Sequence, residues 1–401
     1  MRLLGLAAIL AVLCIGVAPG TGSAEIFGNY IHPYASVTGM YDSNLFRVRS
    51  GEDLRPMVGD DRKSDFITSL ALGVNIEYPI SQQQFSLTAE HDFLWYSHYS
   101  QYNSSQDTLR GAANLRIADR VIGLLSGSYV RMPQPFGDYT GFQKAINTTQ
   151  GFDAFIGYEF PWGFTLKGGG GVQSVSYSTQ ALIGSEYTAP YGFVQGIYKI
   201  SPKTQVDLQY RRDSFNYKVP DGLGLSRDSV QDLIQGGVIY DITAKTRFDL
   251  HLGYLNRRYD SPVTKNFGGI VGKFTAKYAL TEKTQLSAWI ERNLAEEAFI
   301  DQTYSDYRHG GLDVSYRLTA KTLLNAGAEL GNKVFKGDNQ FLFTLLDSRH
   351  DWTHSAYTGV QWSVLERLLT GLNYRYTSRN SNYQTYDYKD HTVDLTVKYQ
   401  F

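Results

Sequence analysis

Apolar and polar residues alternate one by one through long stretches of this 401-residue chain. The alternation is most regular at the end of the chain, HTVDLTVKYQF, where every second residue from Val393 to Phe401 is apolar. A period of two predicts a β-strand with one apolar and one polar face, because successive side chains of a strand point to opposite sides. We therefore expect the last residues to belong to a strand, whereas soluble domains commonly end in a frayed polar tail.

The same alternation recurs far from the C-terminus. It is found in SLALGVNIEYPI (69–80), FTLKGGGGV (164–172), VDLQY (206–210), RFDLHLGY (247–254) and LDVSYRL (312–318). These segments are spread over most of the chain, so the period predicts an all-β protein whose strands have two different faces.

A short motif marks the turns between some of these strands. Tyrosine, any residue, an apolar residue, serine or threonine, any residue, lysine and threonine follow one another from Tyr198, Tyr240, Tyr278 and Tyr316, about 40 residues apart. That interval holds two long strands, one longer loop and one tight turn, for which Ser, Thr and Lys are suitable. Propeller blades and solenoid rungs also repeat at this length, but a blade needs four short strands. The motif therefore predicts β-hairpins.

With these turns as markers, the sequence predicts 18 strands, with 16 as the alternative count. The predicted strands span 31–43, 64–80, 84–102, 105–118, 121–134, 147–160, 163–178, 185–200, 204–218, 226–242, 246–260, 266–280, 284–298, 302–318, 322–336, 346–364, 368–383 and 387–401. Short turns alternate with mostly longer, more polar links. An even count with this alternation is typical of a transmembrane antiparallel up-and-down β-barrel, with short periplasmic turns and longer extracellular loops.

The first 24 residues have the organisation of a secretory signal peptide. Arg2 precedes the apolar stretch LLGLAAILAVLCIGVA, and small residues at 22–24 allow cleavage before Glu25. The sole cysteine, Cys14, lies in this segment, so a mature chain forms no disulfide. We expect a single barrel domain over residues 25–401, without a separate plug, in the outer membrane of a Gram-negative bacterium.

Composition narrows the range of partners. Beyond the signal peptide no stretch of 18 or more apolar residues exists, which excludes membrane-spanning helices. The formal net charge of -1 gives no reason to expect a nucleic-acid partner. The expected partners are outer-membrane lipid, a polysaccharide or other polar solute, periplasmic polysaccharide-export components, and the barrel-assembly machinery, which recognises a terminal aromatic residue.

Aromatic residues recur at the short-turn ends of the predicted strands. They are expected to form one girdle at the lipid headgroups, consisting of Tyr78, Phe160, Tyr198, Tyr240, Tyr278, Tyr316 and Phe401. A soluble periplasmic β-sandwich is the alternative, and it explains neither this girdle nor uninterrupted strands of about 14 residues.

Charged residues occupy the other face of the strands, which would line the lumen. The acidic candidates are Glu77, Glu90, Asp92, Asp153, Glu159, Asp207, Asp249, Glu291, Asp313, Glu329 and Asp394. The basic candidates are Arg110, Arg116, Lys167, Lys199, Arg211, Arg257, Lys273, Lys277, Arg317, Lys333, Arg375, Arg379 and Lys398. At about 18 strands an aqueous interior is expected. Nearly equal numbers of acidic and basic residues suit an uncharged or weakly charged polar solute, or serve only to hydrate the wall.

Two segments leave their roles open. The long, charged loop 44–65 either folds inward as a constriction or lies on the surface in solvent. The aromatic stretch FLWYSHYSQY (93–102) either belongs to the outer girdle or contacts carbohydrate through its rings.

The sequence predicts no catalytic residue, metal site or cofactor. His350 and His354 lie on one face of a predicted strand, where four residues separate them by about 13 Å, too far for one metal ion. The glycines at 168–171 lie within a strand and do not precede a helix, so they are no phosphate-binding loop. No distinctive nucleophile motif is present.

The segment VTGMYDSNLFRV (37–48) resembles the start of the β-barrel porin type 2 family, outer-membrane barrels associated with exopolysaccharide biosynthesis that include the EpsL-like proteins. The matching positions are Asp42, Asn44, Leu45, Phe46 and Arg47, while Ser43 stands where the family commonly has an acidic residue. The resemblance implies a barrel through which a secreted polysaccharide leaves the cell, and it carries over no catalytic residue. Asp42, Asn44 and Arg47 are expected to brace the first loop against the wall.

The sequence is compatible with three functions. The first is passive export of an exopolysaccharide, the second a general or sugar-specific diffusion porin for uptake, and the third a structural or adhesive barrel whose loops bind partners.

Overall fold

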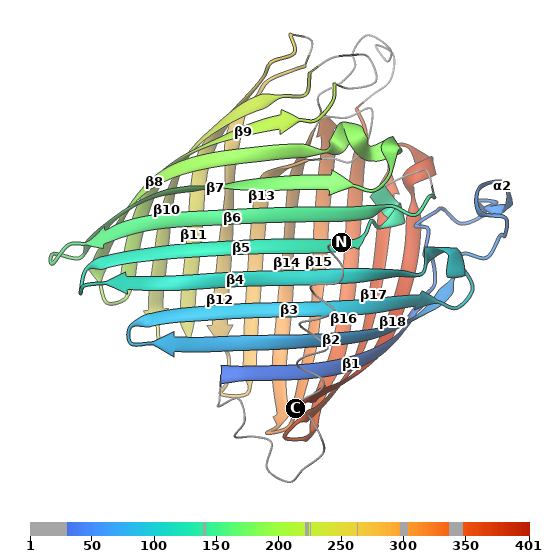
Figure 1. The fold of residues 1–401 in the computed structure, drawn as a ribbon, viewed down its shortest axis with the longest axis horizontal. Coiled ribbons are helices and arrows are strands. Elements are labelled where there is room, and N and C mark those ends of the chain that lie inside the picture. Colours follow the sequence, from blue (N-terminus) through green and yellow to red (C-terminus); the bar gives the residue numbers. More distant parts are fainter. Residues whose placement is uncertain are drawn as a thin grey trace, which may run out of the picture.

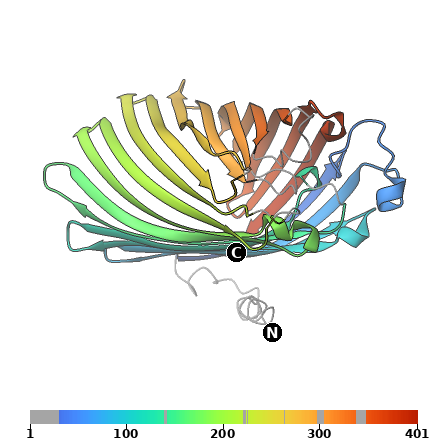
Figure 2. The same ribbon diagram turned by 90° about the horizontal axis from the view of Figure 1, so that it is seen from above.

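The computed structural model describes residues 30–138, 142–220, 224, 226–262, 264–296, 304–336 and 348–401. These residues form one antiparallel sheet of 18 strands that closes on itself as a barrel (Figures 1 and 2). The signal peptide predicted at 1–24 and parts of the longer links lie outside the described residues. Among the described residues, no helix is both long and apolar enough to cross a membrane.

Each strand pairs with the next one along the chain, and the first pairs with the last. The strands are β1 (Ile31–Asp42), β2 (Asp65–Ile80), β3 (Gln83–Tyr96), β4 (Ser104–Ile117), β5 (Val121–Pro133), β6 (Ile146–Glu159), β7 (Phe164–Tyr177), β8 (Tyr187–Ser201), β9 (Thr204–Tyr217), β10 (Ser229–Thr243), β11 (Thr246–Tyr259), β12 (Phe267–Ala279), β13 (Thr284–Glu296), β14 (Tyr304–Thr319), β15 (Thr322–Lys336), β16 (His350–Leu365), β17 (Leu368–Ser381) and β18 (Tyr388–Gln400). The helices are α2 (Arg55–Val58), η3 (Ser100–Tyr102), η4 (Phe136–Asp138), η5 (Gln180–Ser185) and η6 (Gln384–Tyr386), all in loops.

The predicted fold class and the count of 18 strands are confirmed. One predicted boundary is wrong by more than a few residues, because the third strand ends at Tyr96 and not at 102. The reason is a contact with the start of β2. The carboxylate of Asp65 accepts hydrogen bonds from the backbone N–H groups of His98 and Tyr99, both at 2.9 Å, and this turns the chain into η3.

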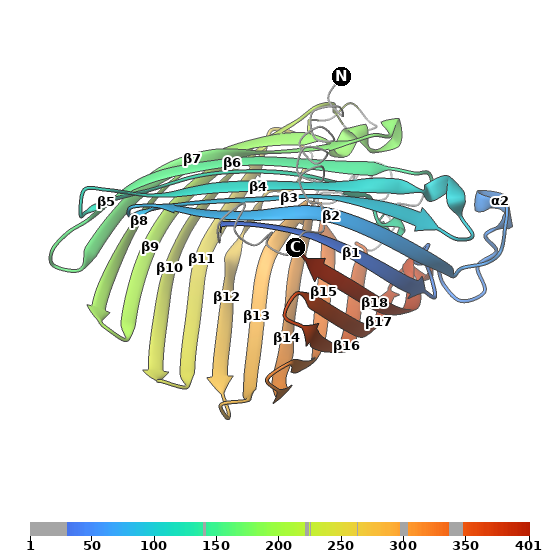
Figure 3. The ribbon, with the colours of Figure 1, turned by 60° about the horizontal axis from the view of Figure 1, so that its bottom comes forward.

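The ring closes between β1 and β18, which lie side by side in Figure 3. Their register pairs Tyr34 with Gln400 and Asp42 with Thr392. Beyond the last strand residue, the backbone N–H of Phe401 donates to the carbonyl of Pro33 at 2.9 Å. The sheet therefore has no free edge, which is what a membrane-spanning sheet requires.

The register also keeps the two faces separate all around the ring. Large apolar side chains on one face remain mostly uncovered, and Leu208, Ile290 and Leu312 are each more than 60% exposed (62%, 64% and 63%). Because leaving such side chains in water is unfavourable, this face is suited to apolar surroundings.

On the opposite face, aromatic side chains lie across glycines of the neighbouring strand. Tyr34 of β1 lies opposite Gly73 of β2, which lies opposite Glu90 of β3, and the Tyr34 hydroxyl donates to Glu90 at 2.6 Å. We call such a three-strand unit an aromatic bridge. The others are Tyr191–Gly171–Asp153, Tyr357–Gly327–Asp313 and, with a histidine, His251–Gly237–Asp207. Only a residue without a Cβ leaves the ring room to lie flat on the wall.

We expect Gly73→Ala to lower the thermal stability of the barrel, with a loss of about 1–3 kcal/mol that is typical of overpacking. A Cβ at this position would lie 2.4 Å from Cζ of Tyr34, so the ring would have to leave and give up its bond to Glu90. The temperature at which the folded, faster-migrating band disappears in semi-native gel electrophoresis measures the effect.

Gly371→Ala is the matched control, since the nearest atom to a Cβ there is Nδ2 of Asn373 at 4.0 Å. Equal losses in both variants would show that the effect comes from strand glycines in general and not from the bridge.

Candidate functional site: the lumen wall and the first loop

The register places all of the predicted lumen residues on the face that carries the aromatic bridges. Lys273, for example, lies opposite Glu291, which lies opposite His309. This face is the inner one, because a contact from it reaches across the barrel. Arg379 of β17 donates through Nη2 to the carbonyl of Gly137, in the loop between β5 and β6, at 2.9 Å. Contact of these residues with a passing solute stays a prediction.

Most of the acidic side chains on this wall are held by neighbours. Three accept a hydrogen bond from a tyrosine in an aromatic bridge. His251 lies between Asp207 (3.3 Å) and Asp249 (2.9 Å). The remaining partners are Arg116 for Glu159, Lys273 for Glu291, Ser355 for Glu329 and Asn373 for Asp394. Because their partners hold these carboxylates, the wall is organised before any solute arrives.

Cations cover the aromatic bridges on the lumen side. Nζ of Lys398 lies 3.6 Å from the ring centre of Tyr34, and the guanidinium of Arg211 lies 3.7 Å from that of Tyr191. Arg375 lies 4.9 Å from the Tyr357 ring. These distances allow cation–π attraction. Each of the three tyrosine bridges therefore has a cation over its ring and its carboxylate bonded to the tyrosine hydroxyl.

Some of the predicted lumen residues are enclosed by the wall, and Arg379 is buried as well, at 6% exposure. Arg257 is fully buried and donates to Ser229 at 2.9 Å and to Glu296, so it braces the wall and does not line it. Lys333 lies against the ring of Tyr307, at 5.3 Å from its centre. Asp92 has one buried carboxylate oxygen without a hydrogen-bond partner in the described part of the chain.

The segment that resembles the porin family forms a network at the start of the first loop. Two guanidinium nitrogens of Arg47 donate to the two carboxylate oxygens of Asp42, both at 2.9 Å, and Nη1 also lies 3.2 Å from Asp390 of β18. Burial alone would lower the pKa of Arg47, but hydrogen bonding and the charges of Asp42 and Asp390 raise it above its usual value. Asn44 donates to the carbonyls of Val48 (2.7 Å) and Lys389 (2.9 Å). These contacts hold the first loop against the long-loop ends of β1 and β18, the first and last strands.

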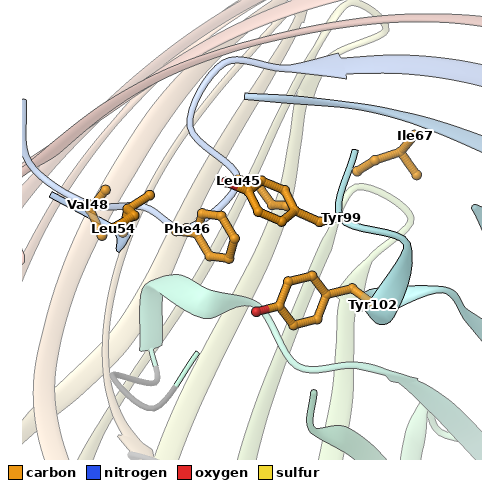
Figure 4. Packing of buried hydrophobic residues seen from close by; sticks show 7 residues of the cluster. All are labelled: Leu45, Phe46, Val48, Leu54, Ile67, Tyr99 and Tyr102. Carbon is orange, nitrogen blue, oxygen red and sulfur yellow. The ribbon is translucent and has the colours of Figure 1, made fainter. Parts of the chain in front are cut away.

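The same loop carries an apolar cluster, which we call the first-loop cluster. It consists of Leu45, Phe46, Val48, Leu54, Ile67, Tyr99 and Tyr102 (Figure 4). Phe46 is only 1% exposed, and its ring contacts those of Tyr99 (4.8 Å between centroids) and Phe136 (5.0 Å). Met40 and Leu94, on the inner face of β1 and β3, pack against it. The cluster therefore joins the first loop to the inner wall and to the loop between β5 and β6.

The two alternatives for loop 44–65 each describe part of it. Residues 45–54 contribute to the first-loop cluster, and Val58 of α2 packs against it. The rest of α2 lies toward solvent at the edge of the molecule in Figure 1, and Met57 is 43% exposed. The stretch 93–102 is divided as well. Phe93 and Trp95 are exposed on the outer face with stacked rings, whereas Tyr99 and Tyr102 are buried.

The tyrosines of the aromatic bridges and the anchoring role of Phe46 were not predicted from the sequence. Tyr34, Tyr191 and Tyr357 resemble any other strand tyrosine in the sequence. The signal would have been a glycine opposite each of them, and this depends on a register that the sequence does not reveal.

The comparisons with known proteins agree on the fold. The family model described as putative beta-barrel porin 2 matches residues 26–401. Crystal structures of Pseudomonas aeruginosa OccK9 (OpdG), OpdO and OpdQ are similar, at 11%, 12% and 11% identity and TM-scores of 0.52, 0.50 and 0.50. The matches cover 92%, 93% and 93% of this chain and 98%, 97% and 98% of those chains. Among curated proteins no significant match was found.

We expect Phe46→Ala to enlarge the opening at the long-loop end of the barrel. Truncating a buried phenylalanine costs about 3–5 kcal/mol, which is enough to release a loop from the wall. Single-channel conductance of the purified protein in a planar bilayer should rise relative to that of the wild-type protein. Met57→Ala, in the same loop but exposed, is the control and should leave conductance unchanged. A conductance that Phe46→Ala does not alter would mean that the first loop does not limit the pore.

Proposed function

Since the chain belongs to the β-barrel porin 2 family, we propose that it is a passive channel through which a polar solute crosses the outer membrane of a Gram-negative bacterium. Porins are channels and not enzymes. The observation that carries the proposal is the inner face of the closed barrel, where charged and hydrogen-bonding side chains occupy the wall from one end to the other. Such a surface keeps water in the lumen, and a polar solute can exchange its hydration for contacts with the wall.

For the solute we propose a secreted exopolysaccharide that moves outward. The first-loop segment with Asp42, Asn44 and Arg47 supports this, because it resembles barrels associated with exopolysaccharide biosynthesis. The wall supports it as well, since its polar groups are held in fixed positions over many strands. A polymer that passes through such a channel would come from periplasmic export components, and the barrel itself from the assembly machinery.

A second candidate is uptake of a small polar solute. The inward packing of the first loop favours it, because the first-loop cluster and the bond from Arg379 to Gly137 narrow the long-loop mouth. A structural or adhesive barrel is a third candidate, and measurable conductance would argue against it.

A deletion strain distinguishes export from uptake. With export, polysaccharide should fall on the cell surface and in the medium and rise in the periplasm, while growth on small sugars stays normal. The wild-type gene supplied in trans should restore the distribution. Unchanged surface polysaccharide together with slower uptake of small solutes would exclude export and support a diffusion porin.

A further inference from the structure

We propose that the short-turn mouth of the barrel carries a cationic ring that draws in an anionic polysaccharide. This inference rests on the proposed channel function and specifies its substrate class and its loading side. The ring consists of Lys199 of β8, Lys277 of β12, Arg317 of β14 and Lys398 of β18. In outer-membrane barrels the short turns lie on the periplasmic side, so the ring faces the compartment from which a secreted polymer arrives.

The four residues share one level of the inner wall. Each is the third residue from the short-turn end of its strand, as the strand ends Ser201, Ala279, Thr319 and Gln400 show. Each also lies beside a tyrosine of the outer face, so the ring is level with part of the aromatic girdle. The four residues therefore occupy the part of the mouth formed by β8 to β18, and none of them lies on β1 to β7.

The four charges are not neutralised by the wall. Their partners across the strand pairs include no carboxylate, since Lys199 faces Gln205, Arg317 faces Leu323 and Lys398 faces Ser36. Within the described residues, none of the four takes part in an ion pair or a side-chain hydrogen bond. Lys398 instead lies over the Tyr34 ring.

Of the four cations, Lys277 gives the strongest argument for a role other than folding stability. It lies directly opposite Ser287 on one side and Arg247 on the other. Two like charges directly opposite each other across a strand pair are destabilising, so folding stability does not account for this pair. Arg247 forms an ion pair with Asp241 at 3.7 Å. The charge of Lys277 has no such partner among the described residues.

The carboxylates near this mouth do not cancel the ring. Glu159 is paired with Arg116, and Asp241 with Arg247. One position further in, Asp207 and Asp249 contact His251. Glu77 lies at the same level and takes part in no ion pair or side-chain hydrogen bond with the described part of the chain. The short turns at this mouth also carry Asp119, Glu282 and Glu366. On the inner wall itself, a solute from the periplasm meets the four cations before it meets a carboxylate that lacks an ion-pair partner in the described residues.

The long-loop end of the wall has a different arrangement of charge. Its acidic residues are buried and paired, as Asp42 and Asp390 are with Arg47 and Asp351 is with Arg349. Free positive charge is thus concentrated at the end where export begins. A ring of one sign selects ions of the other sign, and it raises the local concentration of a polyanion at the mouth. Carboxylate-bearing sugars are the substrate chemistry that this ring fits.

Ion selectivity of the full barrel in a planar bilayer tests the ring. The wild-type protein should prefer chloride over potassium in reversal-potential measurements. The triple variant Lys199→Gln, Lys277→Gln and Arg317→Gln should lose this preference by about threefold or more. The difference should shrink as KCl rises from about 0.01 M to about 1 M, because the Debye length falls from about 30 Å to about 3 Å.

Two further variants control for charge and for folding. Lys203→Gln, Lys245→Gln and Lys321→Gln remove the same net charge from exposed turns at the same end, outside the strands, and should leave selectivity unchanged. Lys199→Arg, Lys277→Arg and Arg317→Lys keep the charge and should retain the wild-type preference.

A polymer block identifies the substrate class. Polygalacturonate added to the short-turn side should reduce the current at about tenfold lower concentration with the wild-type protein than with the triple glutamine variant. Neutral dextran of the same length should block both equally and weakly.

Two results would contradict the proposed role of the cationic ring and leave the proposed channel function unaffected. One is a wild-type barrel that conducts ions without preferring anions, and the other is a triple glutamine variant with the selectivity of the wild type. Export that fails in the triple variant while selectivity is intact would also overturn the ring, and would reassign these cations to docking an acidic periplasmic protein. A barrel that carries no ions would overturn the channel itself, and with it the ring.

Discussion

Every backbone N–H and C=O group of a strand that crosses a membrane must find its partner in another strand, because lipid offers none. In this protein the requirement is met by a ring of 18 strands in which the first strand pairs with both the second and the last. The ring fixes which side chains face outward, and the outer face accordingly carries large, exposed apolar residues. The inner face is then the one place where charged groups can be held, and the candidate site is built there.

Much of this fold could be predicted from the sequence, because strand periodicity survives in a single chain. The four tyrosine motifs located the turns after β8, β10, β12 and β14, and the remaining strands followed from their spacing. The third strand was extended too far for a definite reason. Residues 97–102 continue an aromatic pattern, but Asp65, more than 30 residues earlier, takes the backbone N–H groups of His98 and Tyr99. A contact of that range leaves no local trace in the sequence.

The candidate site was less accessible to prediction. The alternation of side chains along a strand assigns a residue to the inner face, but it does not identify the residue opposite it on the neighbouring strand. An aromatic bridge needs the register of three strands at once, and Arg257 looks like any other inward arginine although Ser229 and Glu296 enclose it. A near balance of charges likewise conceals their distribution. Paired carboxylates and unpaired ammonium groups contribute equally to a net charge, yet they present different surfaces to a solute.

The contacts of the first loop also bear on how the barrel closes. Thr38 and Thr396 are hydrogen-bonded at 2.8 Å between β1 and β18, Lys398 covers Tyr34, and Arg47 and Asn44 reach Asp390 and Lys389. All of these contacts join the two ends of the chain, at the pair formed by β1 and β18. A shift of the closing pair by two residues would keep the inner and outer faces correct and the backbone paired, but it would break these side-chain contacts. These side-chain contacts therefore favour a single alignment of the first and last strands, which backbone pairing alone would not distinguish from an alignment shifted by two residues.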